Sequence, residues 1–408
     1  MPDDIEALHV RLDQLLSDDD ATRAAMFPGT AEGRQPVHTV YLPADRFHAG
    51  VVAEWGAAAR AALEEFGPLN GFDSVQQRLH DKLGAEPIED LRIDFEDGYG
   101  IRPDGQEDEH AWGAARELAA AMGERTAPAF VGLRIKSFEG PVRRRGLRTL
   151  DLFLDGLAAS GPVESWLPTG FRITLPKVTS VVQVAAMVEV CDALEARYEL
   201  PAGRLRFEIQ IETPQAVLGP GGSSLIGPMI HTAAGRCAGL HYGTYDYSAS
   251  VGIAAAYQSM EHPAADFAKA VMQVAAAGTG VPVSDGSTNV LPVGSTDAVR
   301  AGWDLHARLV RRSLERGFYQ GWDLHPAQLP TRFAATFLFF TDGLAAAAAR
   351  LRAYQDRSES GILDEPATAQ ALAGYLLRGL DCGAVSDADI AAQVGIPRKE
   401  LEHLARRA

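Results

Sequence analysis

Eight short β-rich runs, separated by helical stretches, are the feature that most limits what this chain can fold into. The runs cover residues 37–42, 91–95, 130–136, 171–176, 206–212, 238–243, 281–285 and 321–325. Most of them look apolar on both faces, as expected of parallel strands buried on both sides. Eight strand-then-helix units predict an α/β fold of the (β/α)8 TIM-barrel type, with a doubly wound open sheet as the alternative. No GxGxxG motif opens a helix after the first run, which weakens a dinucleotide-binding interpretation.

The sequence outside these units indicates three regions in the 408-residue chain. Residues 1–36 are predicted to form an N-terminal helical lead-in, 37–330 the barrel and catalytic domain, and 331–408 a C-terminal helical extension. The end of the extension, 387–408, resembles a small helix-turn-helix unit. Because the formal net charge is -16, we expect a helical cap or an oligomerisation element there rather than a DNA-binding unit.

Composition restricts the partners and the cellular compartment. The 54 acidic residues outnumber the 38 Lys and Arg residues, so binding to nucleic acid or to an anionic membrane is not expected. The three cysteines form no CxxC pair, so neither a zinc ribbon nor a disulfide framework is predicted, and a cytoplasmic location is expected. The N-terminus lacks the pattern of a signal peptide. The longest apolar run, 333–349, is interrupted by Asp342 and Gly343 and predicts a buried helix.

Two acids lie at strand ends: Glu212 is the last residue of the fifth run, and Asp246 follows the sixth. The C-terminal ends of barrel strands meet at one rim, so these carboxylates are expected to converge, and such a pair repels itself unless a cation or a proton lies between them. Oxygen ligands of this kind suit Mg²⁺ or Mn²⁺. The alternative is that each acid caps a helix or pairs with an arginine. We favour a metal site because Arg134 lies on a neighbouring run.

Arg134 is the candidate for binding a substrate carboxylate, because a guanidinium can grip a carboxylate with two parallel hydrogen bonds. Together with a metal it would suit a 2-oxo acid. A structural ion pair with the acids of residues 94–97 is the alternative. Lys177 could form a Schiff base, but the metal pair makes that mechanism unnecessary. His325 is interpreted as structural, and Cys237 as a small core residue.

Seven short motifs occur in an order typical of a known enzyme group. They are YLPADR (41–46), DFEDG (94–98), LRIKS (133–137), LPKVTS (175–180), IETPQAVLG (211–219), GTYDYSASVG (243–252) and DLHPAQ (323–328). Together they resemble the citrate lyase beta-chain-like group of the HpcH/HpaI aldolase superfamily, which includes malyl-CoA lyases and is related to malate synthases. Lys136 stands where the group usually has Asn or a similar residue, and PADR replaces P-G-x-R, which indicates a divergent branch.

The resemblance implies a metal-dependent carbon–carbon lyase that acts on a 2-oxo or hydroxy acid, or its CoA thioester, through a metal-stabilised enolate. It implies Mg²⁺ or Mn²⁺ as cofactor, coenzyme A as part of the substrate in some members, and a homo-oligomer. The alternatives are a malate-synthase-like condensing enzyme and a non-catalytic barrel subunit.

The motifs also imply roles for individual residues. These are metal binding by Glu212 and Asp246, substrate-carboxylate binding by Arg134, hydrogen bonding within the catalytic site by Glu96 and Asp97, and a position near the CoA nucleotide for Arg46.

Overall fold

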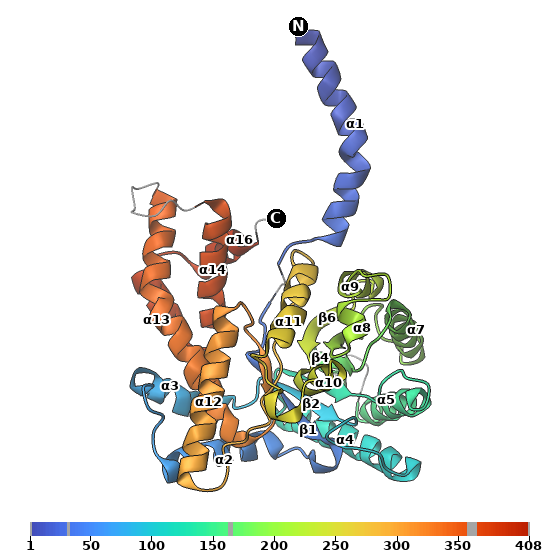
Figure 1. The fold of residues 1–408 in the computed structure, drawn as a ribbon, viewed down its shortest axis with the longest axis vertical. Helices are drawn as coiled ribbons and strands as arrows, with labels where there is room; N and C mark the ends of the chain where they lie inside the picture. Colours follow the sequence, from blue (N-terminus) through green and yellow to red (C-terminus); the bar gives the residue numbers. More distant parts are fainter. Residues whose placement is uncertain (1, 31–32, 162–165, 357–364, 407–408) are drawn as a thin grey trace.

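The predicted (β/α)8 barrel is confirmed by the computed structural model, which describes residues 2–30, 33–161, 166–356 and 365–406 (Figure 1). All eight strands are parallel and each overlaps one predicted run. They are β1 (His38–Pro43), β2 (Asp90–Asp94), β3 (Phe130–Arg134), β4 (Phe171–Leu175), β5 (Phe207–Ile211), β6 (Cys237–Tyr242), β7 (Val283–Ser284) and β8 (Gly321–Asp323).

The sheet runs in the order β7-β6-β5-β4-β3-β2-β1-β8 and nearly closes on itself. The seam between its two end strands is bridged by backbone hydrogen bonds just beyond β7. The amide of Asp285 donates to the carbonyl of Gln320 at 2.9 Å, and the amide of Trp322 donates to the carbonyl of Gly286 at 3.1 Å. The barrel therefore closes where β7 itself is only two residues long.

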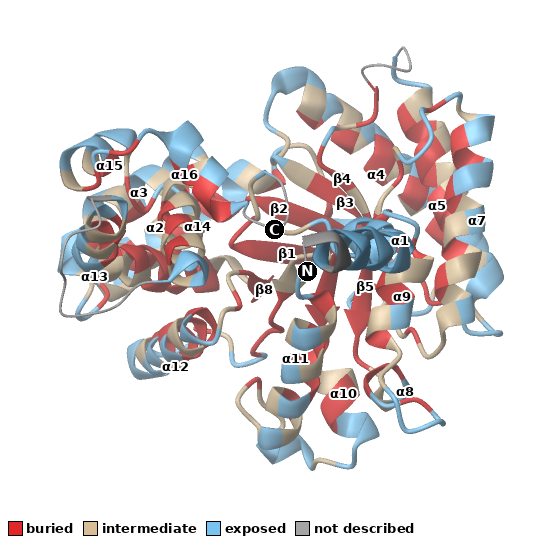
Figure 2. Ribbon diagram, turned by 90° about the horizontal axis from the view of Figure 1, so that it is seen from above, coloured by how far each residue is buried: buried red, intermediate tan, exposed pale blue. Residues whose placement is uncertain are grey.

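Helices surround the strands and bury their outer faces (Figure 2). Those within the barrel domain are α2 (Val51–Phe66), α3 (Gln76–Ala85), α4 (Asp104–Glu124), α5 (Arg143–Ala158), α7 (Val181–Arg197), α8 (Pro214–Val217), α9 (Ile226–Thr232), α10 (Thr244–Ser250), α11 (Pro263–Ala276) and α12 (Thr296–Glu315). Short 3-10 turns occur at η1 (Ala44–Arg46), η2 (Asp73–Val75), η3 (Ala255–Tyr257) and η4 (Pro326–Gln328). Local chemistry fixes several helix starts. Ser180 and Gln183 form a capping box at α7, and His262 caps α11, whose first residue is Pro263.

The N-terminal and C-terminal segments are helical, as expected. A single helix, α1 (Pro2–Met26), projects away from the barrel, and its described side chains from Ile5 onward are exposed (Figure 1). The other end of the chain contributes α13 (Leu329–Asp356), α14 (Pro366–Asp381), α15 (Asp387–Gln393) and α16 (Arg398–Ala405). The second half of α13 packs with these helices around a separate hydrophobic cluster that includes Leu351, Leu376 and Leu401.

In the described part of the chain, one helical segment, Pro326–Gln355, which includes most of α13, is long and apolar enough to cross a membrane, judged by length and composition only. Half of its most apolar window is buried, and Phe333 and Phe337 belong to the main hydrophobic core. This packing matches the buried helix that was predicted for residues 333–349.

The inner faces of the strands are polar, so the expectation that the strands are apolar on both faces is wrong for the inside of the barrel. In β5, Phe207, Ile209 and Ile211 belong to the apolar core beneath the helices. The alternate residues Glu208, Gln210 and Glu212 are buried on the other face. Since side chains alternate along a strand, Glu212 is the last of an inward-facing polar series rather than an isolated acid.

Arg92 of β2 lies at the centre of this interior and is 0% exposed. It forms ion pairs with Asp90 of the same strand and with Glu208 of β5 across the barrel. Its Nε also donates to Thr174 Oγ1 of β4 at 3.0 Å. Burial acts to raise the pKa of Glu208, but Arg92 and His241 outweigh it and hold that pKa well below its usual range. The network thus ties strands from different sides of the barrel together.

We predict that Arg92→Met lowers the free energy of unfolding by about 3–5 kcal/mol, because it leaves two carboxylates buried without their cation. Urea denaturation followed by circular dichroism measures the change. Arg308→Met is the matched control, since Arg308 forms an exposed pair with Glu261 and should change stability little. Equal effects of the two substitutions would contradict the central role of Arg92.

Candidate functional site

A cavity of about 460 Å³ opens at the C-terminal ends of the strands. Its lining comes from strand ends and the loops that follow them, and it includes Arg46, Asp97, Arg134, Glu212 and Asp246. In a barrel this is the end where catalytic groups gather. The structure therefore brings most of the predicted site residues to one cavity.

Glu212 is held rigidly just beyond β5 and is 2% exposed. Its Oε1 accepts a hydrogen bond from the backbone amide of Lys177 at 2.7 Å. Its other oxygen lies so close to Gly243 that a Cβ there would approach within 2.3 Å, so residue 243 must be glycine for the carboxylate to keep this position. Burial raises the pKa of Glu212 to about 8; Lys177 opposes this shift and the charge of Asp246 adds to it.

Lys177, considered above for a Schiff base, lies among the acids of the site. Its backbone has φ 52°, in the left-handed region that costs a residue with a side chain about 1–2 kcal/mol. Its ammonium donates to Glu96 Oε1 at 2.5 Å and to both oxygens of Asp97 at 2.8 and 2.9 Å. The carboxylate of Asp246 lies 3.6 Å away. Strained backbone of this kind is typical of functional sites.

The charge state of Lys177 argues against Schiff-base chemistry. Burial acts to lower its pKa, but the carboxylates of Glu212 and Glu96 outweigh burial and raise the pKa above its usual value. A lysine nucleophile needs a lowered pKa, because only the neutral amine attacks a carbonyl. Lys177 is therefore a fixed positive charge in this geometry.

Carboxylates outnumber cations around the cavity, even when the exposed Arg46 is counted. The acids are Asp94, Glu96, Asp97, Glu212 and Asp246, and the cations are Arg134, Lys177 and Arg46. Burial raises the pKa of Asp246, with Lys177 acting in the opposite direction and Asp97 adding to the rise. Burial is the main cause of these raised carboxyl pKa values, and the five carboxylates outnumber the three cations, so a hard divalent cation fits this oxygen-rich donor set.

The described residues hold no group of three or more His, Cys, Asp or Glu side chains arranged as a complete metal site. Glu212 and Asp246 would thus be the protein's own direct donors. Mg²⁺ suits such a site, because it commonly keeps several waters and takes only one or two carboxylates from the protein.

Arg134 lies beside this group, but one edge of its guanidinium is already used. Its Nε and Nη2 each donate to Asp94 at 2.7 Å. Its Nη1 lies 3.5 Å from Glu96 Oε2, and its guanidinium carbon lies 4.8 Å above the centre of the Tyr41 ring. The structural pairing that the sequence left open is therefore present, and the Nη1 end remains as the part of Arg134 that can meet a ligand.

Glu96 and Asp97 lie side by side at the end of β2 and share Lys177. Burial raises the pKa of Glu96 to about 7, against the effects of Arg134 and Lys177. The pKa of Asp97 is shifted in the opposite direction. Burial acts to raise its pKa, but hydrogen bonds with Glu96 and Lys177 lower it. Two neighbouring carboxyl groups whose pKa values are pushed apart are a common arrangement in acid–base sites.

Several other strand-end residues have structural partners instead. The ammonium of Lys136 bonds to Glu107 at 2.6 Å and to the carbonyl of Phe95 at 2.8 Å. Asp285 accepts from Lys269 at 2.9 and 3.0 Å and from Ser313 at 2.6 Å. These contacts fix the fold around the site.

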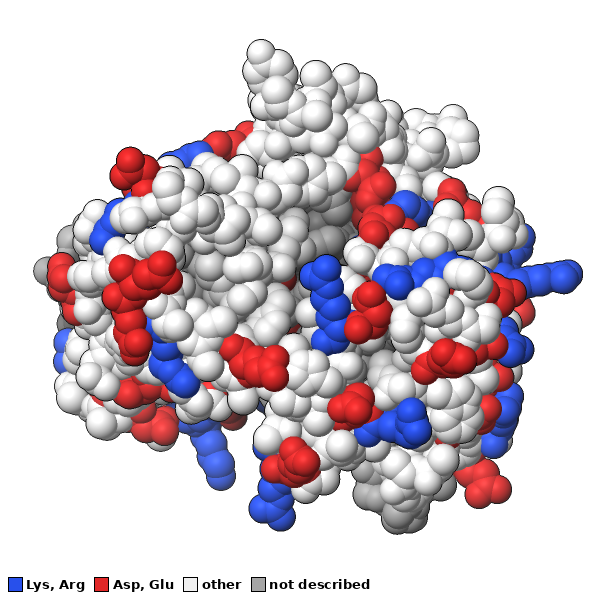
Figure 3. Space-filling model, turned by 90° about the horizontal axis from the view of Figure 1, so that it is seen from below, with Lys and Arg blue, Asp and Glu red and all other residues white. Residues whose placement is uncertain are grey.

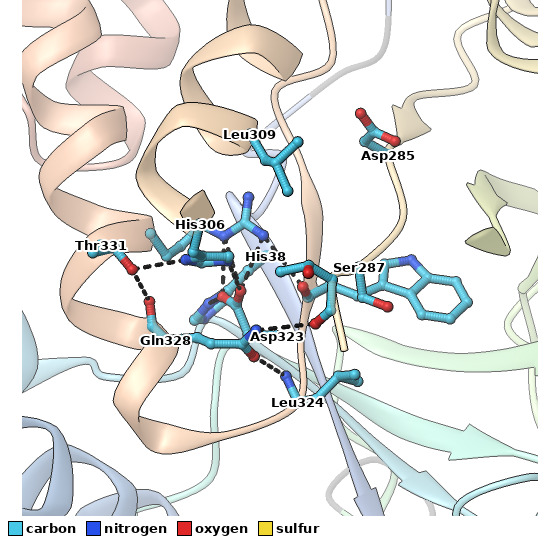
Figure 4. A network of polar contacts seen from close by, with 12 residues as sticks. His38, Asp285, Ser287, His306, Leu309, Asp323, Leu324, Gln328 and Thr331 are labelled. Carbon is cyan, nitrogen blue, oxygen red and sulfur yellow. Dashed lines mark hydrogen bonds and ion pairs between the residues drawn. The ribbon is translucent and has the colours of Figure 1, made fainter. Parts of the chain in front are cut away.

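Figure 4 shows the network at the end of β8, where Asp323 joins the barrel to α12 and α13. Its carboxylate pairs with Arg332 at 3.0 Å, with His38 at 2.7 Å and with His306 at 3.1 Å. His325 caps η4, accepting from the amide of Ala327 at 3.2 Å, which agrees with its structural interpretation.

Aromatic residues of the cavity were missed at the sequence level. Tyr41 and Trp322 line it from β1 and β8, with ring centroids 4.5 Å apart, and Tyr245 accepts from the amide of Asn289 at 2.6 Å. For Tyr41 and Trp322, the alternation of side chains along their strands was the available signal, whereas Tyr245 lies in α10. The molecular face seen from below carries acidic and basic side chains interspersed around a hollow (Figure 3).

The chain belongs to the family described as "Domain of unknown function (DUF6986)", whose model matches residues 16–408. No curated protein matches the sequence. Among solved structures, the malate synthase of Haloferax volcanii in complex with magnesium and glyoxylate is similar, with a TM-score of 0.54 and 14% identity over 91% of this chain and 98% of that one. This likeness shows a shared fold.

Two further solved structures are more distantly similar. CitE of Mycobacterium tuberculosis, in complex with magnesium, acetoacetate and coenzyme A, has a TM-score of 0.49 and 17% identity over 86% of this chain and 99% of that one. RipC of Yersinia pestis has a TM-score of 0.42 and 18% identity over 74% of this chain and 95% of that one.

Proposed function

We propose that the protein is a divalent-metal-dependent enzyme that cleaves a carbon–carbon bond in a 2-oxo or hydroxy acid, or in the CoA thioester of such an acid. The observation that carries this proposal is the excess of carboxylates over cations at the C-terminal mouth of the barrel, beside Arg134 and a cavity of about 460 Å³. Such a site attracts a cation and can place a small anionic substrate next to it. The motif order described above supports the reaction class.

Glu212 and Asp246 would hold Mg²⁺ or Mn²⁺. When bound, the cation would supply positive charge for the carbonyl and carboxylate oxygens of the substrate and would stabilise the negative charge that develops during bond cleavage. Gly243 and the amide of Lys177 keep the carboxylate of Glu212 in place for this role.

Arg134 would hold the substrate carboxylate through its Nη1 end. Asp94 grips the opposite edge of the guanidinium, which fixes the direction in which Nη1 points. A guanidinium held in this way orients its ligand at little entropic cost. The stacked Tyr41 ring further limits its movement.

Cleavage requires that the substrate hydroxyl loses its proton while the carbon–carbon bond breaks. The bonding electrons pass to the departing carbon, which is later protonated. Glu96 and Asp97, joined through Lys177, are the candidates for accepting and returning the proton. Arg46, at the exposed rim, would meet the anionic nucleotide of a CoA substrate.

The proposal also includes the homo-oligomer and the cytoplasmic location expected from the sequence. Helix α1 exposes Leu8, Leu12 and Leu15, which offer apolar surface to a second copy of the chain.

The metal site generates the first test. We expect Glu212→Gln and Asp246→Asn each to weaken Mn²⁺ binding by at least about 10-fold. Replacing a residue that only supports a metal ligand already lowers metal affinity by about 10- to 100-fold. Lys177→Met should tighten binding, since the ammonium neutralises the same carboxylates. Isothermal calorimetry measures both effects.

Asp151→Asn is the control for the metal experiment, because Asp151 pairs with Arg197 on the outer surface. If both Glu212→Gln and Asp246→Asn keep the affinity of the parent protein, the site assignment is wrong.

The reaction is tested by a screen of 2-oxo acids, hydroxy acids and acyl-CoA esters with Mg²⁺, with products identified by mass spectrometry. We expect cleavage products that disappear with Asp246→Asn and persist with Asp151→Asn. Glyoxylate with acetyl-CoA is included to detect a condensing enzyme instead. A protein that binds the metal but converts none of these compounds would contradict the proposed reaction.

Arg134 provides a separate test of substrate binding. Arg134→Lys should weaken pyruvate binding in the presence of Mg²⁺ by roughly 1–3 kcal/mol, because a point charge replaces a directed guanidinium. Arg102→Lys is the matched control, since Arg102 pairs with Asp45 near the rim. Calorimetry showing equal affinity for the two variants would remove Arg134 from the site.

A further inference from the structure

A second and larger cavity, of about 860 Å³, lies at the opposite mouth of the barrel. Residues at or just before the start of every strand line it, including Gln35, Asp90, Phe130, Cys237 and Gln320. Seen from above, α1 stands over this end of the strands, and Met26 and Pro28 contribute to the rim (Figure 2). The cavity is large enough for a small organic ligand.

Arg172 and Arg206 lie next to each other in this cavity. Ile173 of β4 pairs with Phe207 of β5, so the residues that precede them are neighbours on adjacent strands. Both arginines have the same alternation as Thr174 and Glu208, which contact Arg92, and they therefore face the barrel axis. Two guanidinium groups thus point into the same space.

Neither arginine has a carboxylate partner within the described ranges. Arg172 donates to the carbonyl of Phe171 at 2.7 Å, and Arg206 donates to the carbonyl of Cys237 at 3.2 Å. The Nε of Arg206 is buried and has no hydrogen-bond partner in the described part of the chain. A buried donor without an acceptor costs about 1–3 kcal/mol, so an acceptor is expected to fill the place.

Three other arginines line the cavity, and none of them is without a partner; Arg406 is one of these three. Arg34 bonds to Glu86 at 2.8 and 2.9 Å and contacts Glu89 at 2.7 Å. Arg92 is neutralised by Asp90 and Glu208, as described above. Arg172 and Arg206 therefore differ from Arg34 and Arg92 in having no carboxylate partner within the described ranges.

The repulsion between the two arginines affects the pKa of Arg172. Burial and the neighbouring charge of Arg206 lower the pKa of Arg172 to about 10. This occurs in a chain whose formal net charge is -16. Acidic residues are in excess, yet within the described ranges none of them pairs with either of these adjacent arginines. Two adjacent unpaired guanidinium groups repel each other, so an anion bound between them would be favourable.

We propose that the N-terminal mouth of the barrel is a binding site for a small polyanion, carrying carboxylate or phosphate groups, held by Arg172 and Arg206. Paired guanidinium groups match the planar oxygen pairs of carboxylates and phosphates. The site is separate from the C-terminal cavity, because the central network of Arg92 and Glu208 lies between them. Its ligand does not compete with the substrate of the proposed reaction.

The test is calorimetric titration of the full chain with pyrophosphate, citrate and inorganic phosphate at low salt, with EDTA present so that no divalent metal contributes. We expect saturable binding of at least one of these probes at one site per chain. Arg172→Gln/Arg206→Gln should weaken it at least about tenfold, because each substitution removes charge-assisted hydrogen bonds. Which probe binds most tightly distinguishes phosphate from carboxylate ligands.

Arg148→Gln/Arg197→Gln is the matched control, since it removes the same charge from exposed arginines that pair with Asp108 and Asp151. Asp246→Asn should not weaken binding, since it removes no positive charge from this cavity, and this separates the site from the proposed metal site. If the double variant does not fold, the single variants Arg172→Lys and Arg206→Lys are used instead. Each keeps the positive charge but loses the paired donors of the guanidinium, so each should weaken binding. Undiminished binding in the folded variants, or no saturable binding of any probe, overturns the proposal.

Discussion

The ion-pair network around Arg92 is the interaction on which the rest of the barrel depends. A guanidinium that is 0% exposed must be neutralised inside the protein, and Asp90 and Glu208 do this, while Thr174 accepts a hydrogen bond from a third strand. The network fixes how β2, β4 and β5 face one another and fills the interior with polar groups. Burial at the C-terminal end of this interior raises the pKa of Glu212, and the nearby charge of Asp246 adds to the rise.

The strands were predictable because local sequence determines them. Each predicted run overlaps a strand, and the largest difference in length is at β7, which is two residues long. The polar interior could also have been predicted, because β5 alternates strictly between apolar and polar residues. Phe207, Ile209 and Ile211 are apolar, and Glu208 and Gln210 between them are polar. The error was to expect apolar residues on both faces of the strands, whereas only one face of β5 is apolar.

The details of the site depend on contacts between distant segments, and local patterns do not contain these. Arg134 had two open interpretations, and only the register of β2 and β3 places Asp94 opposite it. The position of Lys177 requires a left-handed backbone, which no propensity favours for lysine. Arg172 and Arg206 are 34 positions apart in sequence and become neighbours only through the pairing of β4 with β5. Such coincidences of register create the charge clusters at both mouths.

The two mouths therefore carry opposite excess charge, and this has an energetic consequence. Arg206 and Glu212 flank β5 directly, six residues apart, which places the two ends about 20 Å from each other. At an effective dielectric constant near 20, two unit charges at that separation interact by about 0.8 kcal/mol, or roughly a fourfold change in affinity. An anion at the N-terminal mouth would thus favour a cation at the C-terminal mouth. Because linkage is reciprocal, the cation would strengthen anion binding by the same factor.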